Sequence, residues 1–174
     1  VFDTCVLVPS FLRAVLLSCA RAGYIEPLAT PRILKEWRRA AKTPLQRLEA
    51  ENAVRQFLDD FPEAIRPDPV DLRPYWLPDP GDVHILALAA VHHADAIITH
   101  NKKDFPQAEL NTYGITRIDP DAQLLQLYKL HGTALMDQLR PVLAEVQSAH
   151  PQMPALELWR KAWLPQFGRK FDRL

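Results

Sequence analysis

The stretch DPGDVHILALAA, residues 79–90, decides how the middle of this 174-residue chain folds. An acid followed by proline is typical of a helix start, because the acid caps free N–H groups and proline suits the first helical position. The pattern predicts Asp79 as the N-cap and Pro80 at the first position. Asp82 then falls at the third position, where the helix dipole also favours a carboxylate. Capping alone therefore explains both acids.

The pairing of a capping residue with proline recurs along the chain and predicts further helix starts. It is found at Thr30-Pro31, Thr43-Pro44 and Asp119-Pro120. The helices expected are residues 10–22 (ended by Gly23), 31–42, 44–60 and a helical region from residue 119 that bends or breaks at Pro141. Short apolar segments predict strands at residues 1–8, 64–67, 95–100 and 114–119.

Strands that alternate with helices favour an α/β fold, with a mainly parallel sheet flanked by helices. From Asp119 onward the pattern is helical only. We therefore expect an α/β domain over residues 1–118 and a C-terminal all-helical extension over residues 119–174. Trp159 and Trp163 are four residues apart and are expected on one helix face, packing the extension onto a core.

The chain has no overall charge that would attract nucleic acid. Basic and acidic residues number 21 each, so the formal net charge is zero and RNA binding needs a local patch. The run Arg38, Arg39 and Lys42 is one candidate for such a patch. The equal alternative is that these residues form an ordinary solvated helix face.

Cys5 and Cys19 lack the spacing of a metal site or a redox pair and are expected as buried free thiols of a cytoplasmic protein. The apolar stretches are too short to span a membrane.

Acids that are far apart in the sequence are expected at one edge of the sheet. Helix N-termini and the carboxyl ends of strands share that edge, and ligands bind there. Asp3 lies in the first predicted strand, Asp82 at a helix start and Asp104 after the strand that ends near Thr99. The apolar neighbours of Glu36 turn this residue inward from an early helix.

Such acids repel one another unless a cation lies between them. Two unit charges about 4 Å apart cost roughly 4 kcal/mol at an effective dielectric near 20. An all-oxygen ligand set favours Mg²⁺ or Mn²⁺ over zinc. A metal of this kind serves the hydrolysis of phosphodiester bonds.

In order and spacing, four segments resemble the PIN-domain family of metal-dependent ribonucleases and, more narrowly, the bacterial VapC-type toxins. They are VFDTCVLV (1–8), ILKE (33–36), DPGDVHILALAA (79–90) and ADAIITHNKKDF (94–105). The resemblance implies a PIN-like fold and a catalytic metal site formed by Asp3, Glu36, Asp82 and Asp104. Asn101 stands where many relatives carry aspartate, and could coordinate through its carbonyl oxygen. An RNA substrate, Mg²⁺ or Mn²⁺ as cofactor, a cognate antitoxin and a homodimer are also implied.

Two other functions stay open. A non-catalytic PIN-like module that binds RNA or protein is favoured by the neutral Asn101. A 5′ nuclease acting on structured DNA is disfavoured, because the chain is short for the extra helical arch of such enzymes.

Several polar residues are given structural interpretations. His84 and His100 are expected as bystanders near the pocket mouth, and Thr99 as the last residue of a strand. A hydroxyl bond from Thr99 to an acidic neighbour is the alternative. Asp95, Asp119 and Asp121 are expected to act in turns and caps.

Overall fold

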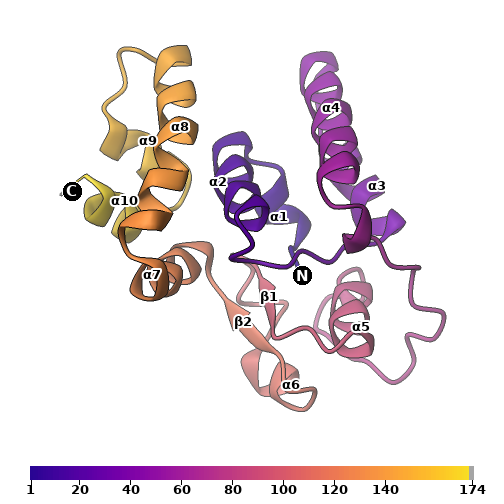
Figure 1. The fold of residues 1–174 in the computed structure, drawn as a ribbon. Coiled ribbons are helices and arrows are strands. Elements are labelled where there is room, and N and C mark those ends of the chain that lie inside the picture. Colours follow the sequence, from indigo (N-terminus) through magenta and orange to yellow (C-terminus); the bar gives the residue numbers. More distant parts are fainter. Residues whose placement is uncertain (173–174) are drawn as a thin grey trace. The chain divides into compact units, whose positions relative to one another are not determined.

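The computed structural model describes residues 1–172, which fall into two compact units (Figure 1). The first unit joins Val1–Val8 with Pro27–Ile118. The second joins Pro9–Glu26 with the chain from Asp119 onward, so one amino-terminal helix groups with the C-terminal helices. The division into domains 1–118 and 119–174 stays a prediction.

The centre of the first unit is a small parallel sheet. Strand β1 (Ala96–Ile98) pairs in parallel with β2 (Thr116–Ile118). Phe2 forms a parallel bridge with Ile98, so that β1 lies between Phe2 and β2. Helix α5 contacts β1 and α6 contacts β2, which confirms the predicted α/β fold with a parallel sheet flanked by helices (Figure 1).

The helices of the first unit are α1 (Thr4–Leu7), α3 (Pro31–Arg39), α4 (Pro44–Asp60), the 3₁₀ turn η1 (Pro62–Ala64), α5 (Val83–Val91) and α6 (Gln107–Asn111). Two of them, α3 and α4, begin at the predicted prolines. Thr30 caps α3 and Thr43 caps α4, each through its side-chain oxygen. Helix α3 ends at Arg39, three residues before the predicted end.

The predicted strand over residues 1–8 is wrong beyond Phe2. The Asp3 carboxylate accepts the Cys5 N–H, and the chain turns into a short helix at Thr4. An acid that binds the backbone two residues on favours this turn over an extended strand. The predicted strand at 64–67 is likewise reduced to one parallel bridge between Ala29 and Ile65.

Helix α5 begins at Val83, three residues later than predicted. The Asp79 carboxylate accepts the Gly81 N–H at 2.7 Å, and the Asp82 N–H bonds to the Asp79 carbonyl at 3.1 Å. This tight turn replaces the first helical turn. Asp82 becomes the N-cap residue, but its side chain makes no capping hydrogen bond. Capping therefore does not account for the Asp82 carboxylate.

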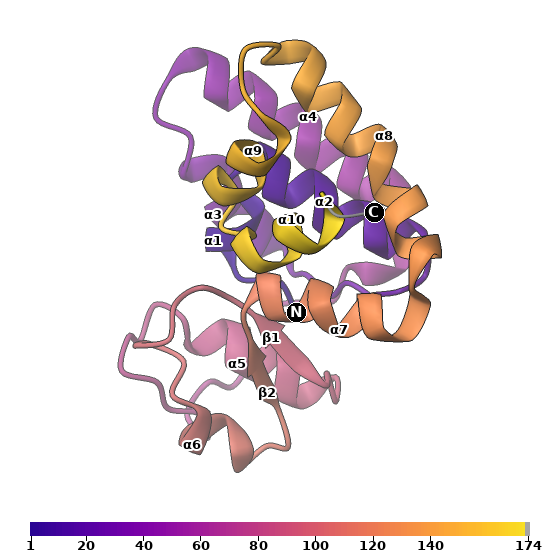
Figure 2. The ribbon, with the colours of Figure 1, turned by 90° about the vertical axis from the view of Figure 1, so that its left-hand side faces the viewer.

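The second unit is helical in its described part, as expected for the C-terminal region. Its helices are α2 (Ser10–Arg21), α7 (Pro120–His131), α8 (Thr133–Ala149), α9 (Ala155–Lys161) and α10 (Pro165–Phe171). Helix α2 packs on α8, and α10 packs on α7 and α9 (Figure 2). Gly23 and Gly132 follow α2 and α7 with positive φ, as expected for residues that end helices. Helix α8 continues through Pro141, so the chain does not break there, and the bend, the other alternative, stays a prediction.

An aromatic cluster forms the core of the second unit. The buried Trp159 ring lies 4.9 Å from that of Phe11, 5.4 Å from that of Phe167 and 5.1 Å from that of Phe171. Trp163 lies beyond the end of α9, with a φ of 57° and 55 % of its surface exposed. The prediction that both tryptophans share one helix face is wrong, because α9 ends at Lys161.

Asp119 and Asp121 have the structural roles that the sequence indicates. The Asp119 side chain caps α7 by accepting the Asp121 N–H at 3.0 Å. The buried Asp121 carboxylate accepts the N–H groups of Gln166 and Phe167 at 2.9 and 2.8 Å, at the start of α10. Among the helices of residues 1–172, none combines the length and apolar character needed to cross a bilayer.

Candidate metal centre

Three acids of the first unit come together close to the sheet. Asp79, Asp82 and Asp104 each offer one carboxylate oxygen, and these oxygens lie within 4.8 Å of one another. The first two belong to the turn before α5, and Asp104 follows β1 in the chain. Asp82 and Asp104 are half-buried, and Asp79 is exposed. A group of carboxylate oxygens this close suits a hard divalent cation such as Mg²⁺ or Mn²⁺.

Asp3 is buried at the carboxyl end of the same sheet. Its N–H bonds to the Ile98 carbonyl of β1. Its Oδ2 accepts the Thr99 hydroxyl at 2.6 Å, and its Oδ1 accepts the Cys5 N–H at 3.4 Å. Neighbouring parallel segments end at the same edge, so strand pairing itself brings Thr99 beside Asp3. The alternative interpretation of Thr99, a hydroxyl bond to an acidic neighbour, is confirmed.

Asp82 experiences the negative charge of the whole group. Burial first, and then the carboxylates of Asp3, Asp79, Asp104 and Glu36, raise the pKa of Asp82 from its usual 3.8 to about 7. The acids that the sequence predicted at one edge of the sheet therefore act electrostatically on one side chain. A bound cation would relieve this repulsion.

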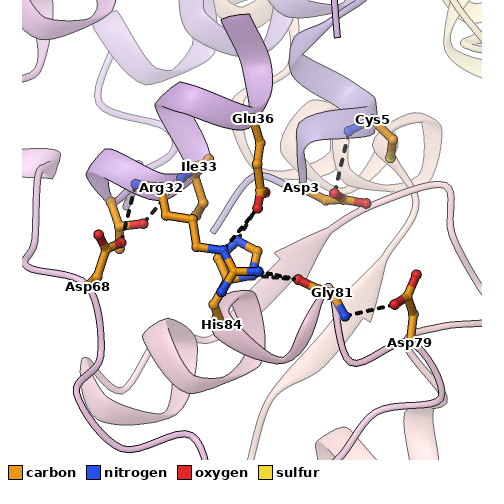
Figure 3. A network of polar contacts seen from close by, with 10 residues as sticks. Asp3, Cys5, Arg32, Ile33, Glu36, Asp68, Asp79, Gly81 and His84 are labelled. Carbon is orange, nitrogen blue, oxygen red and sulfur yellow. Dashed lines mark hydrogen bonds and ion pairs between the residues drawn. The ribbon is translucent and has the colours of Figure 1, made fainter. Parts of the chain in front are cut away.

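Glu36 comes from α3, is bound by Arg32 and lies beside His84 (Figure 3). The Arg32 Nε donates to Glu36 Oε1 at 3.0 Å. The His84 Nε2 lies 3.1 Å from Glu36 Oε2, close enough for an ion pair but without hydrogen-bond geometry. Arg32 Nη2 and His84 Nδ1 both contact the Gly81 carbonyl, at 3.0 and 2.8 Å. Glu36 is thereby connected to the turn that carries Asp82.

His84 is not the bystander that the sequence suggested. Only 2 % of its surface is exposed, and burial lowers the pKa of its imidazole while the Glu36 charge opposes that shift. Because a carbonyl can only accept, the contact with Gly81 places a proton on Nδ1. The His84 side chain is therefore fixed in orientation inside the site.

Asn101 faces the acids as a hydrogen-bond donor. Its Nδ2 donates to Asp104 Oδ2 at 2.8 Å and lies 3.5 Å from Asp82 Oδ2. Its Oδ1 accepts the Asp104 N–H at 3.2 Å. The carbonyl oxygen that could coordinate a metal is thus used by the backbone, and the amide orients the Asp104 carboxylate instead.

The thiol of Cys5 borders the site without adding a nucleophile. Its Sγ lies 3.4 Å from the Thr99 hydroxyl oxygen. Burial and the Asp3 charge raise the pKa of the Cys5 thiol to about 12, and burial raises that of Cys19 to about 12. Both cysteines are free, as expected, and both remain thiols near neutral pH.

Three residues of this site differ from what the sequence predicts. The sequence predicts Asp79 as a helix cap and His84 as a bystander, and it predicts no role for Arg32. Two acids flanking Pro-Gly indicate a turn rather than a helix. Arg32 precedes Glu36 by four residues, the spacing at which helical side chains pair. These signals were present in the sequence, but the joint contact of Arg32 and His84 with Gly81 depends on the fold.

Replacing Thr99 with valine removes the hydrogen bond to Asp3 and the acceptor of the Asn101 N–H, which is bonded at 2.9 Å. Outer partners of metal-binding groups typically contribute 10–100-fold to metal affinity or activity. We expect Thr99→Val to weaken Mn²⁺ binding about tenfold in calorimetric titration. Thr99→Ser keeps the hydroxyl and should bind like the parent protein. Equal affinities of all three proteins would contradict this role of the hydroxyl.

The fold and the site define a class: an α/β protein with a group of acids beside a small parallel sheet, suited to a divalent cation. A family profile described as the PIN domain matches residues 1–103. The chain therefore belongs to the PIN-domain family. PIN domains are generally metal-dependent nucleases, and the acidic group of this chain fits that chemistry. Searches of curated proteins and of solved structures gave no match.

Proposed function

We propose that this protein is a metal-dependent endoribonuclease that hydrolyses phosphodiester bonds of RNA. The observation that carries the proposal is the convergence of oxygens from Asp79, Asp82 and Asp104 within 4.8 Å. The electrostatic effect of the Asp3 and Glu36 carboxylates on Asp82 further supports the proposal. A group of acids in this arrangement is stabilised by a cation, and RNA hydrolysis is a reaction that such a cation serves.

Each acid has a role in this proposal. Asp3, Glu36, Asp82 and Asp104 hold Mg²⁺ or Mn²⁺, and one of them orients the attacking water. Asp79 joins the ligands because of its place in the cluster. Thr99 fixes the Asp3 carboxylate and Asn101 fixes that of Asp104. The cation, when bound, supplies Lewis-acid stabilisation of the charge that develops on the phosphate.

The biological setting is proposed from the resemblance to VapC-type toxins. The protein would be the toxin of a type II toxin–antitoxin pair, inhibited by a cognate antitoxin and active in the cytoplasm as a homodimer. The free thiols of Cys5 and Cys19 agree with a reducing compartment. Co-purification with the product of a small adjacent gene, and inhibition by it, would support this setting, and an adjacent gene product that neither binds nor inhibits the protein would argue against it.

The two candidate functions, a nuclease and a non-catalytic module, predict different fates for RNA when a metal ion is bound. We expect Mn²⁺ to bind in calorimetric titration, single-stranded RNA to be cut in Mg²⁺ or Mn²⁺, and EDTA to stop cleavage. Mn²⁺ binding together with RNA binding but no cleavage would favour the module, which the neutral Asn101 supports. Cleavage of branched DNA in preference to RNA would favour the 5′ nuclease. No binding at millimolar Mn²⁺ would exclude the metal site.

A further inference from the structure

Glu36 is held by contacts that reach a second part of the site. Arg32 binds Glu36 through Nε and the Gly81 carbonyl through Nη2, both at 3.0 Å. His84 contacts the same carbonyl through Nδ1 and places Nε2 beside the other Glu36 oxygen. Figure 3 shows both side chains between α3 and the turn that precedes α5.

Gly81 directly precedes Asp82, so its carbonyl belongs to the turn that presents two of the clustered acids. Without a partner, the Glu36 side chain, about one-third exposed, would sample several rotamers and lose them on binding a ligand. The planar guanidinium of Arg32 can bind two acceptors at fixed angles, which a lysine cannot do. Arg32 thus sets the position of Glu36 relative to Asp79 and Asp82.

A second arginine on the same helix, Arg38, forms a comparable ion pair away from the acids and can be compared with Arg32. Arg38 donates its Nε to Glu51 at 3.0 Å, the distance found between Arg32 and Glu36. The side chains of Arg32 and Arg38 are also similarly exposed, at 39 % and 37 %. Glu51 lies on α4, so the Arg38 pair joins two helices without involving the acids of the site. The Arg38 pair represents the ordinary structural role of an exposed ion pair.

We propose that Arg32 is a positioning residue, which holds the Glu36 carboxylate toward the turn of Asp79–Asp82 by binding both Glu36 and the Gly81 carbonyl. The proposal rests on the metal-dependent function proposed above. It assigns to Arg32 no contact with substrate or metal. Arg32 acts through Glu36.

The test compares Arg32→Gln with its matched control Arg38→Gln. Because groups that orient a metal-binding residue typically contribute 10–100-fold, we expect Arg32→Gln to weaken Mn²⁺ binding and lower kcat by at least tenfold. The KM for RNA should stay within about twofold, since no substrate contact is removed. Arg38→Gln should match the parent in Mn²⁺ affinity, kcat and KM. Equal Mn²⁺ affinity and kcat in both variants would overturn the proposal.

A double-mutant cycle distinguishes positioning from general stabilisation. In a Glu36→Gln background the carboxylate is already absent, so adding Arg32→Gln should change neither Mn²⁺ affinity nor kcat further. A further tenfold loss in that background would overturn the proposal. If Arg32→Gln does not fold, Arg32→Lys serves instead, because its ammonium keeps the charge but cannot bind Glu36 and the Gly81 carbonyl together at fixed angles. It should lower Mn²⁺ affinity and kcat at least tenfold, and parent values would overturn the proposal.

The outcomes for the parent protein separate this inference from the proposed function. If the parent binds Mn²⁺ and cleaves RNA while Arg32→Gln behaves like Arg38→Gln, only the positioning role fails. If the parent binds no Mn²⁺, the metal-dependent function fails and the positioning role fails with it.

Discussion

Replacement of Asp82 by asparagine is expected to abolish RNA cleavage and, at the same time, to raise the melting temperature of the metal-free protein at pH 8. The loss of activity should exceed the 10–100-fold typical of groups that only orient a metal-binding residue, because Asp82 is proposed as a direct ligand. The gain in stability follows from burial and from the four nearby acids, which together raise the pKa of Asp82. Asparagine keeps the shape of the side chain and removes the charge.

The pH dependence of this gain has a definite sign. The pKa of Asp82 is about 7 in the folded protein and near 3.8 when unfolded, so ionisation of Asp82 opposes folding. The penalty on the free energy of unfolding begins near pH 4, grows as the pH rises toward 7 and is complete above 7. Since Asp82 is half-buried, solvent screening limits the penalty to about 1–2 kcal/mol, or roughly 2–8 °C in melting temperature.

Thermal unfolding in EDTA at pH 4 to 8, followed by circular dichroism, measures this effect. Asp82→Asn should melt above the parent at pH 8, and the difference should shrink as the pH falls. Asp59→Asn, which removes an exposed acid on α4, is the control and should change the melting temperature little. An Asp82→Asn variant that cleaves RNA normally, or that melts below the parent at pH 8, would contradict the charge cluster.

Gly168→Ala should destabilise the second unit by about 3 kcal/mol, which corresponds to roughly 6–12 °C in melting temperature. A Cβ atom at Gly168 would lie 2.4 Å from the Cβ of Trp159, where α10 meets α9. Neither atom can move by rotation of its own side chain, so the two helices must separate. The buried Trp159 ring and its contacts with Phe167 and Phe171 would be displaced as well.

Gln166→Ala is the matched control on the same helix. The Gln166 side chain is exposed, and its backbone N–H, which bonds to Asp121, is kept in the variant. Equal melting temperatures for Gly168→Ala and Gln166→Ala in differential scanning calorimetry would show that α9 and α10 approach less closely than described.

The sequence predicted best those features that depend on a few neighbouring residues. The caps at Thr30, Thr43 and Asp119 and the helix end at Gly23 were all confirmed, because each depends on local backbone chemistry. The sequence-based predictions failed where the same residue could form either of two local backbone structures. Asp3 and Asp79 both use their carboxylates to bind the backbone two residues on, and each forms a turn where a strand or a helix was expected.

The candidate site was likewise predicted only in part. The gathering of acids near one edge of the sheet was predicted from the order of strands and helices, since that order determines which segment ends lie together. The membership of Asp79 and the burial of His84 were not predicted. Both depend on where α5 starts, and that start depends on the turn at Gly81.

By itself, the sequence of this protein determined the α/β class, several helix starts and four of the acids proposed for the site, because capping, proline and periodicity act over a few residues. Only the tertiary structure decided which atoms meet. The hydrogen bonds from Thr99 to Asp3 and from Arg32 to Gly81 join residues 96 and 49 positions apart. Such contacts form only when packing brings distant segments together, and no short stretch of sequence specifies them.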